Sequence, residues 1–211
     1  MKIVVTGFEP FGGESINPAQ EAVALVPEEV AGTQIVKITV PVVFSRAIET
    51  VCDAIDREMP DAVLCIGQAG GRFTLTPERV AINIDDARIP DNAGNRPVDR
   101  PIATEGPAAY FATLPVKAMV EAIQRAGIPA SLSNSAGTYV CNHLMYGVLH
   151  YLACCHPEIK GGFMHVPYLH EQVKDKPNAS KLPWRRLLKP NNQNHRLIHS
   201  TGGVDYRIYE L

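Results

Sequence analysis

Six short apolar runs, most of them rich in β-branched residues, recur along this 211-residue chain and limit its possible folds more than any other feature. Several of the runs are continuously apolar, as is typical of strands that are covered on both faces of a sheet. We expect strands at residues 2–8, 34–40, 61–67, 79–84, 129–135 and 161–166.

Amphipathic segments with helical spacing lie between these runs, at residues 45–58, 115–127 and 142–155. The second of them starts with Pro115 at a predicted first helical position and ends at Gly127, a typical residue beyond a helix end. The alternation of strands and helices predicts an α/β fold, a three-layer α/β/α sandwich with a mainly parallel central sheet. In such sheets, functional sites gather at the carboxyl ends of the strands.

The composition indicates one globular domain over residues 1–211, because 45% of the residues are hydrophobic and 20% are charged. A net charge of −2 with mixed signs argues against a nucleic-acid-binding protein. We find neither a signal peptide nor an apolar run of the roughly 20 residues that span a bilayer. The five cysteines are odd in number and form no CxxC pair, so we expect a reducing cytoplasm.

The longest predicted loop covers residues 85–107 and is rich in Pro, Asp and Asn. Loops of this length are usually functional or mobile. Two interpretations are open: a flap over a site, or a solvated excursion of the chain.

Cys141 lies where small, turn-forming residues give way to a helical pattern. As a free cysteine it is a buried small hydrophobe, a metal ligand or a nucleophile. Cys154 and Cys155, beside His156 at the end of a predicted helix, suggest a metal site, but adjacent cysteines followed by His-Pro lack structural-zinc spacing, which disfavours it. A thiol in the first turn of a helix faces unpaired N–H groups and the positive end of the dipole, which favour the thiolate. The same N–H groups can hold an oxyanion.

A nucleophilic cysteine needs a base, which in turn needs an orienting group. His165 lies near the carboxyl end of a predicted strand and is the best candidate base, with His170 second. For the orienting group we select Glu78, which comes just ahead of a predicted strand. The alternative for Glu78 is an exposed carboxylate paired with Arg72 or Arg79.

The Gly-rich turn in residues 65–72 follows a predicted strand but lacks phosphate-loop and dinucleotide-binding spacing. Its backbone N–H groups near Gln68 are candidates for holding an oxyanion. From the residues alone, the pattern is that of a cysteine hydrolase with a shielded site. A cysteine amidase for another small cyclic or γ-amide substrate, and a binding protein that keeps only the fold, are the alternatives.

Seven segments together resemble the pyroglutamyl-peptidase I family, the pyrrolidone-carboxylate peptidases. They are TGFEPFGG…NP (6–18), GQAGGR (67–72), ERVAIN (78–83), ARIPDN (87–92), GPAAY (106–110), AGTYVCNHLMYG (136–147) and GGFMHVPYLHEQ (161–172). The resemblance implies an α/β/α cytosolic cysteine peptidase that removes an N-terminal 5-oxoprolyl residue from peptides. It further implies no metal or other cofactor, and a homo-oligomer, either a dimer or a tetramer.

The resemblance also implies residue roles: Cys141 as nucleophile, His165 as general base and Glu78 as the group that orients the base. Gln68 and the Cys141 amide would stabilise the oxyanion. The substrate-binding residues that it implies are Phe8, Phe11, Asn17, Ile89, Tyr139 and Val140, with Asn17 supporting the first loop.

Residues 184–200 depart from the family pattern, because relatives usually end in a long amphipathic helix and here Pro190 and three asparagines oppose one. A locally altered reading frame that is compensated downstream and ordinary divergence are the two explanations. Paired insertions or deletions in the coding DNA would establish the first. In either case we predict reduced stability or altered assembly with unchanged chemistry, because Cys141, His165 and Glu78 lie outside this segment.

Overall fold

The computed structural model describes residues 1–173, without the side chains of His170 and Glu171. Its central sheet has six strands in the order β2-β3-β1-β4-β8-β5. The strands are β1 (Lys2–Phe8), β2 (Glu29–Val30), β3 (Thr33–Val40), β4 (Ala62–Gln68), β5 (Thr76–Glu78) and β8 (Lys160–Val166).

The four inner strands β3, β1, β4 and β8 are parallel, and the edge strands β2 and β5 are antiparallel to their neighbours. The sheet is therefore mainly parallel, as predicted. The four runs at 2–8, 34–40, 61–67 and 161–166 form these inner strands to within one residue at each end. They are the apolar runs that lie in the middle of the sheet, where both faces are covered.

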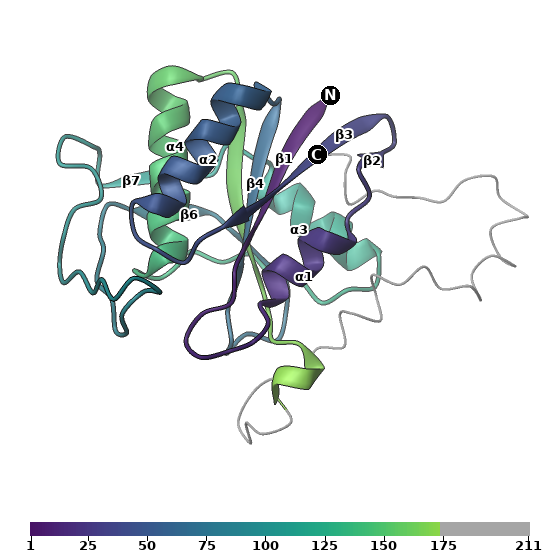
Figure 1. Ribbon diagram of the computed structural model, residues 1–211. Coiled ribbons are helices and arrows are strands. Elements are labelled where there is room, and N and C mark those ends of the chain that lie inside the picture. Colours follow the sequence, from purple (N-terminus) through teal and green to yellow (C-terminus); the bar gives the residue numbers. More distant parts are fainter. Residues whose placement is uncertain (174–211) are drawn as a thin grey trace, which may run out of the picture.

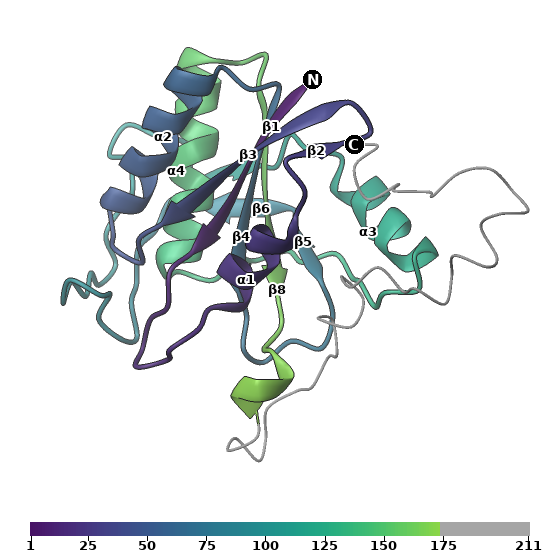
Figure 2. The ribbon, with the colours of Figure 1, turned by 45° about the vertical axis from the view of Figure 1, so that its right-hand side comes forward.

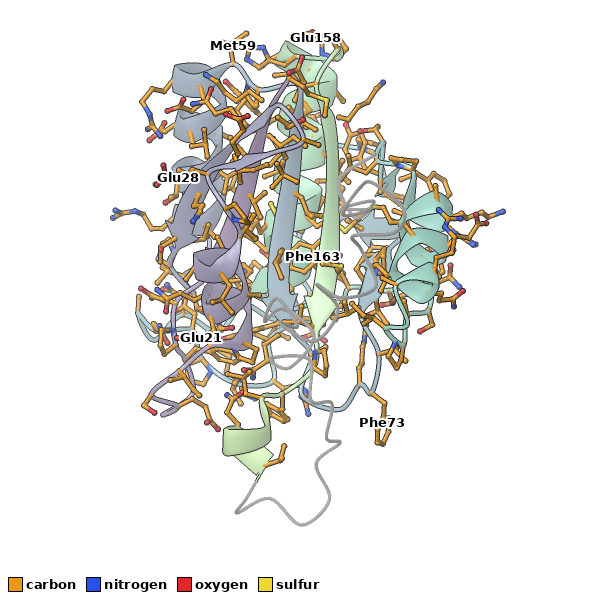
Figure 3. The ribbon with its side chains drawn as sticks, turned by 90° about the vertical axis from the view of Figure 1, so that its right-hand side faces the viewer. Glu21, Glu28, Met59, Phe73, Glu158 and Phe163 are labelled. Carbon is orange, nitrogen blue, oxygen red and sulfur yellow. The ribbon has the colours of Figure 1, made fainter. Side chains whose placement is uncertain are left out.

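Helices cover both faces of the sheet and complete the three predicted layers (Figure 1). Figure 2 shows α2 and α4 together on one face, with α1 and α3 on the other. The larger core lies under α2 and α4, where Val4, Val51, Leu144 and Phe163 are almost fully buried. Phe163 lies at the middle of the sheet in Figure 3. The helices are α1 (Pro18–Leu25), α2 (Arg46–Glu58), α3 (Val116–Arg125) and α4 (Val140–Cys155).

The three predicted helices are present with small shifts at their ends. Pro115 precedes α3 as its N-cap instead of being its first residue, and Gly127 follows it with a φ of 77° that favours glycine. Helix α4 begins two residues before the predicted 142, so it includes Cys141. No helix in residues 1–173 has the length and apolar content that crossing a bilayer requires.

Helix α1 was not predicted, although the sequence carries a signal for it. Asn17 accepts a hydrogen bond from the Ala19 N–H at 3.0 Å as the N-cap, and Pro18 is the first helical residue. Both are preferred at these positions. The helix has only 8 residues, too short for a clear hydrophobic period.

Two predicted strands differ from the structure. Residues 79–84 contribute only β6 (Val80–Ile82), which pairs with β7 (Ala109–Phe111) in a separate two-stranded sheet. Residues 129–135 form only isolated bridges to residues 75 and 78. The segment 129–135 runs beside the edge strand β5, and Ala130 is the only buried residue in it. It therefore gains too little burial to form a regular strand.

We predict that Gly7→Ala destabilises the fold because β1 and α1 approach each other closely at this point. An added Cβ would lie 2.7 Å from the Ala19 carbonyl oxygen, which belongs to the backbone and cannot rotate away. Overpacking of this kind costs about 1–3 kcal/mol. Urea unfolding measures the change. Gly71→Ala is the matched control, since its Cβ meets no atom within 4 Å; equal stabilities for both variants would contradict the prediction.

Candidate active site

A cavity of about 520 Å³ opens at the carboxyl ends of β1, β4 and β8, the edge of the sheet at the bottom of Figure 1. Nine of the ten predicted site residues line it, and the tenth, Glu78, lies behind His165. The nine lining residues are Phe8, Phe11, Asn17, Gln68, Ile89, Tyr139, Val140, Cys141 and His165.

His165 and Glu78 form a buried pair on neighbouring antiparallel strands. Thr76 lies opposite His165 and Glu78 opposite Phe163, so Glu78 and His165 are diagonal neighbours on one face of the sheet. Their side chains join through His165 Nδ1 and Glu78 Oε1 at 2.7 Å, and they are 4% and 0% exposed. The Phe163 ring packs against the imidazole with ring centroids 4.9 Å apart. The predicted contact between His165 and Glu78 is therefore present.

The ionisation of Glu78 decides which nitrogen of His165 carries the proton. Burial alone raises the pKa of the Glu78 carboxyl, but the hydrogen bond and charge of His165, together with hydrogen bonds to Ser133 and Arg72, outweigh burial, so the pKa is lowered. An ionised carboxylate only accepts hydrogen bonds, so Nδ1 must donate. In the neutral imidazole, Nε2 is then an unprotonated acceptor, and His165 lines the cavity.

Cys141 is the second residue of α4, in the first turn, as predicted. Its sulfur lies beside Gly67 of β4, where an added Cβ would be only 2.9 Å from Sγ. Gly67 is in turn the register partner of His165 on β8. The missing side chain at Gly67 thus makes room for the thiol next to the strand that carries the histidine. Residues 1–173 contain no Cys141–His165 hydrogen bond, a contact that in unliganded enzymes often forms only with substrate.

Burial favours the neutral form of both the thiol and the imidazole. Burial, followed by the charge of Glu78, raises the pKa of Cys141 to about 12. Burial also lowers the pKa of His165, against the opposing effect of Glu78. This corrects our expectation of a thiolate at the helix N-terminus: burial of the sulfur outweighs the favourable position in the first turn.

The turn after β4 lines the cavity through Gln68, Ala69, Gly70 and Gly71. The Ala69 N–H donates to the Val166 carbonyl at 2.9 Å, so it is not available to an oxyanion. The Gln68 side-chain oxygen accepts a hydrogen bond at 3.2 Å from Gln172, which belongs to the short 3-10 helix η1 (His170–Val173). Gln172, which the sequence analysis did not select, therefore fixes Gln68.

Aromatic rings form one wall of the cavity. The Phe11 and Tyr139 rings lie 6.2 Å apart, and Phe44 meets Tyr139 edge-on at 5.6 Å. Phe8 is nearly buried between the cavity and Phe163. This wall offers flat apolar surface to a small ligand.

Asn17 lines the cavity, but the structure commits both ends of its amide to the protein. Its oxygen caps α1, and its nitrogen donates to the Glu9 carbonyl at 2.8 Å. Asn17 therefore holds the loop between β1 and α1, which carries Phe11, in the supporting role that we expected for it.

The first part of the predicted loop 85–107 lies at the cavity, so it is more than a solvated excursion. Asp86, Arg88 and Ile89 line the cavity. The Tyr139 hydroxyl donates to the Pro90 carbonyl at 3.0 Å, and the Thr138 hydroxyl donates to the Asp86 carbonyl at 2.8 Å. These bonds tie the loop to the segment that precedes Cys141.

Three further residues of the site were missed or misplaced by the sequence analysis. Arg72 does pair with Glu78, but the carboxylate is buried and not exposed. Asn142 ties the start of α4 to β6 through Ile82 and Ile84, a link between segments that no local pattern reveals. Tyr168 lines the cavity and packs on Gly70.

The remaining candidates are the metal site and the alternative base His170. Among residues 1–173, no group of three or more His, Cys, Asp or Glu side chains is arranged to hold a metal ion. Cys154 and Cys155 are exposed at the end of α4. The alternative base His170 begins η1, and its side chain lies outside the described part of the chain, as does the atypical segment 184–200.

Comparison with known proteins identifies the family. The sequence model described as pyroglutamyl peptidase matches residues 1–189. The chain belongs to the pyroglutamyl peptidase family. It is 58% identical to a pyrrolidone-carboxylate peptidase of Alkaliphilus oremlandii over 182 residues, which are 86% of this chain and 85% of the relative. A Streptococcus pyogenes pyrrolidone-carboxylate peptidase is 60% identical over the same shares of the two chains.

Solved structures of the family have the same fold. The pyroglutamyl peptidase I of Bacillus amyloliquefaciens superposes with a TM-score of 0.85 at 49% identity, covering 89% of this chain and 90% of that one. A mutant pyrrolidone carboxyl peptidase from Pyrococcus furiosus gives a TM-score of 0.85 at 41% identity, covering 89% and 93%.

We predict that the two hydrogen bonds of Asn17 have separable effects. Asn17→Ala removes both, and loss of the cap lowers stability by about 1 kcal/mol. Asn17→Ala also raises KM, because the loop that carries Phe11 loses its bond to the Glu9 carbonyl. Asn17→Ser restores a capping oxygen but not that bond, so stability recovers while KM stays raised. Thermal unfolding and steady-state kinetics measure the two effects. A serine variant with wild-type KM would show that the bond to Glu9 does not matter for substrate binding.

Proposed function

We propose that this chain is a cysteine peptidase that removes an N-terminal pyroglutamyl residue from peptides, with Cys141 as nucleophile, His165 as general base and Glu78 as the group that orients the base. The observation that carries the proposal is the buried Glu78–His165 pair, which opens onto the same cavity as Cys141. Membership of the pyroglutamyl peptidase family supports the substrate class.

Acylation begins with both groups neutral. As Cys141 Sγ attacks the pyroglutamyl carbonyl, its proton passes to His165 Nε2, and Glu78 stabilises the imidazolium that forms. The oxyanion accepts hydrogen bonds from the Cys141 amide and from the turn that follows Gln68. His165 then gives its proton to the departing amine, the C–N bond breaks, and a thioester remains on Cys141.

Deacylation reverses the proton path. Water takes the place of the released peptide, His165 Nε2 accepts one of its protons, and the hydroxide oxygen attacks the thioester carbonyl. When the C–S bond breaks, the proton returns to the sulfur and free pyroglutamate leaves. The enzyme ends in its neutral starting state.

The cavity chemistry suits a lactam. An N-terminal pyroglutamyl residue is small, flat and uncharged, so its ring fits against the Phe11–Tyr139 wall, with Phe8, Ile89 and Val140 completing the enclosure. Hydrogen bonds to the lactam N–H and C=O reject proline, because polar groups of the site would then lose their partners. A free N-terminal glutamate or glutamine brings charge that an apolar wall does not pair.

The same proposal includes the cellular setting and assembly. The five cysteines without a CxxC pair favour the cytoplasm. The family resemblance favours a homo-oligomer, a dimer or a tetramer. No cofactor enters the mechanism, which uses only the thiol, the imidazole, the carboxylate and water.

We expect the wild-type protein to release a fluorophore from a pyroglutamyl amide under reducing conditions, and not from the matched prolyl or glutaminyl amides. Cys141→Ser lowers kcat/KM by at least about 10³-fold, because the nucleophile is lost. Fluorescence kinetics measure both, with and without a chelator, which should have no effect.

Cys154→Ser is the matched control, because Cys154 is exposed on the same helix at its far end. It should keep wild-type activity. A folded wild type that cleaves another small cyclic amide but no pyroglutamyl amide would refute the substrate assignment. Equal losses in both serine variants would refute the role of Cys141.

The acid limb of activity depends on His165, which must be neutral to accept a proton. Its pKa is lowered below the ordinary 6.5, so kcat/KM should be lost as the pH falls, with a midpoint below 6.5. Glu78→Gln moves the midpoint lower still, because the charge of Glu78 raises the pKa of His165. A wild-type midpoint above 6.5 in the pH profile would contradict the lowered pKa of His165.

A further inference from the structure

Arg72 joins three parts of the site that are separate in the sequence. It belongs to the loop between β4 and β5, and one of its terminal nitrogens donates to both Thr76 Oγ1 and Glu78 Oε1. The other donates to the Ser135 carbonyl at 3.0 Å, in the segment that leads to Cys141. Its side chain is 29% exposed, whereas that of Glu78 is fully buried.

Glu78 Oε1 therefore accepts from two sides at once. His165 Nδ1 donates to it at 2.7 Å from β8, and Arg72 donates to it from the loop. A buried carboxylate with one partner can rotate about its side-chain bonds, and a second, charged donor removes that freedom. The guanidinium is suited to this because its donors point in fixed directions and reach different acceptors at the same time.

We propose that Arg72 is a positioning residue of this site: it aims the Glu78 carboxylate at His165, and it holds the Gln68 turn and the segment before Cys141 at a fixed separation. The inference deepens the proposed function and rests on it, because the reacting atoms are those of Cys141 and His165. Arg72 itself touches neither thiol nor imidazole through a hydrogen bond among those that the structure records in residues 1–173.

The electrostatics agree with this geometry. The positive charge of Arg72 lowers the pKa of His165 and lowers that of Cys141, in both cases against the effect of Glu78. Burial is the main cause of the lowered pKa of His165, and Arg72 adds to it; at Cys141 the charge of Arg72 opposes burial and favours the developing thiolate. The other titratable or charged groups around the pair are Glu78 on β5, Cys65 on β4, and Asp86, Arg88, Tyr139 and Tyr168 at the cavity.

The test compares Arg72→Gln with Arg72→Lys and with the control Arg79→Gln. Arg79 follows Glu78 directly in the chain and makes no ion pair within residues 1–173. Replacing it with Gln removes one positive charge, as Arg72→Gln does. Arg72→Gln should lower kcat about tenfold or more with little change in KM, because general-base catalysis contributes about 10²–10⁴-fold. Its acid limb should move to higher pH. Arg79→Gln should match wild type in both.

Arg72→Lys separates charge from geometry. The lysine keeps the positive charge, so the acid limb should stay near its wild-type position, but a single ammonium cannot reach Glu78 and Ser135 together in the same way, so kcat should still fall. If Arg72→Gln does not fold, the lysine variant decides alone: wild-type kcat in Arg72→Lys would overturn the positioning role.

Alkylation of Cys141 by iodoacetamide, followed by peptide mapping, needs no substrate. Arg72→Gln should slow the reaction of Cys141 at each pH, while the exposed Cys154 reacts at an unchanged rate. An Arg72→Gln protein of reduced thermal stability, with wild-type acid limb and alkylation rates, would show a merely structural role and overturn the proposal. If wild type cleaves no pyroglutamyl amide, the proposed function fails, and the alkylation rates still decide the role of Arg72.

Discussion

The buried carboxylate of Glu78 is the interaction on which the site depends. A carboxylate that is fully removed from water is strongly unfavourable unless charged or polar partners surround it, and here His165 and Arg72 provide them. The same pairing selects the His165 tautomer and leaves Nε2 as an acceptor. Because the three residues come from β8, β5 and the loop before β5, the site is assembled only when the edge of the sheet has formed.

Close backbone approach is the second constraint. Gly67 leaves the space that the Cys141 sulfur occupies, and Gly70 leaves the space for the Tyr168 ring. Parallel pairing of β4 with β8 puts Gly67 level with His165, so one register places the thiol and the imidazole at the same edge. A shift of one residue in that pairing would turn His165 away from the cavity, since side chains alternate between the faces of a strand.

The neutral resting state has a consequence for how the site works. Burial of both groups disfavours charge on each, so in the proposed mechanism proton transfer from Cys141 to His165 accompanies attack on the substrate instead of preceding it. Burial also keeps water away from the thiol and the imidazole, which strengthens the electrostatic interactions that stabilise the transition state. Such a buried site requires partners that are held in fixed positions, and Glu78 and Arg72 are placed to act as these partners.

The amino-acid sequence by itself determined the inner strands, three of the four helices and the position of Cys141 in a first helical turn, because hydrophobic period and turn residues act over short distances. It also made His165 and Glu78 the candidates for base and orienting group. The family resemblance added the residues of the pocket. Only the tertiary structure decided that Glu78 is buried, that Arg72 joins it to the segment before Cys141, and that burial keeps the thiol neutral. These properties arise from contacts between segments far apart in the chain, and no local pattern encodes which side chains then lose contact with water.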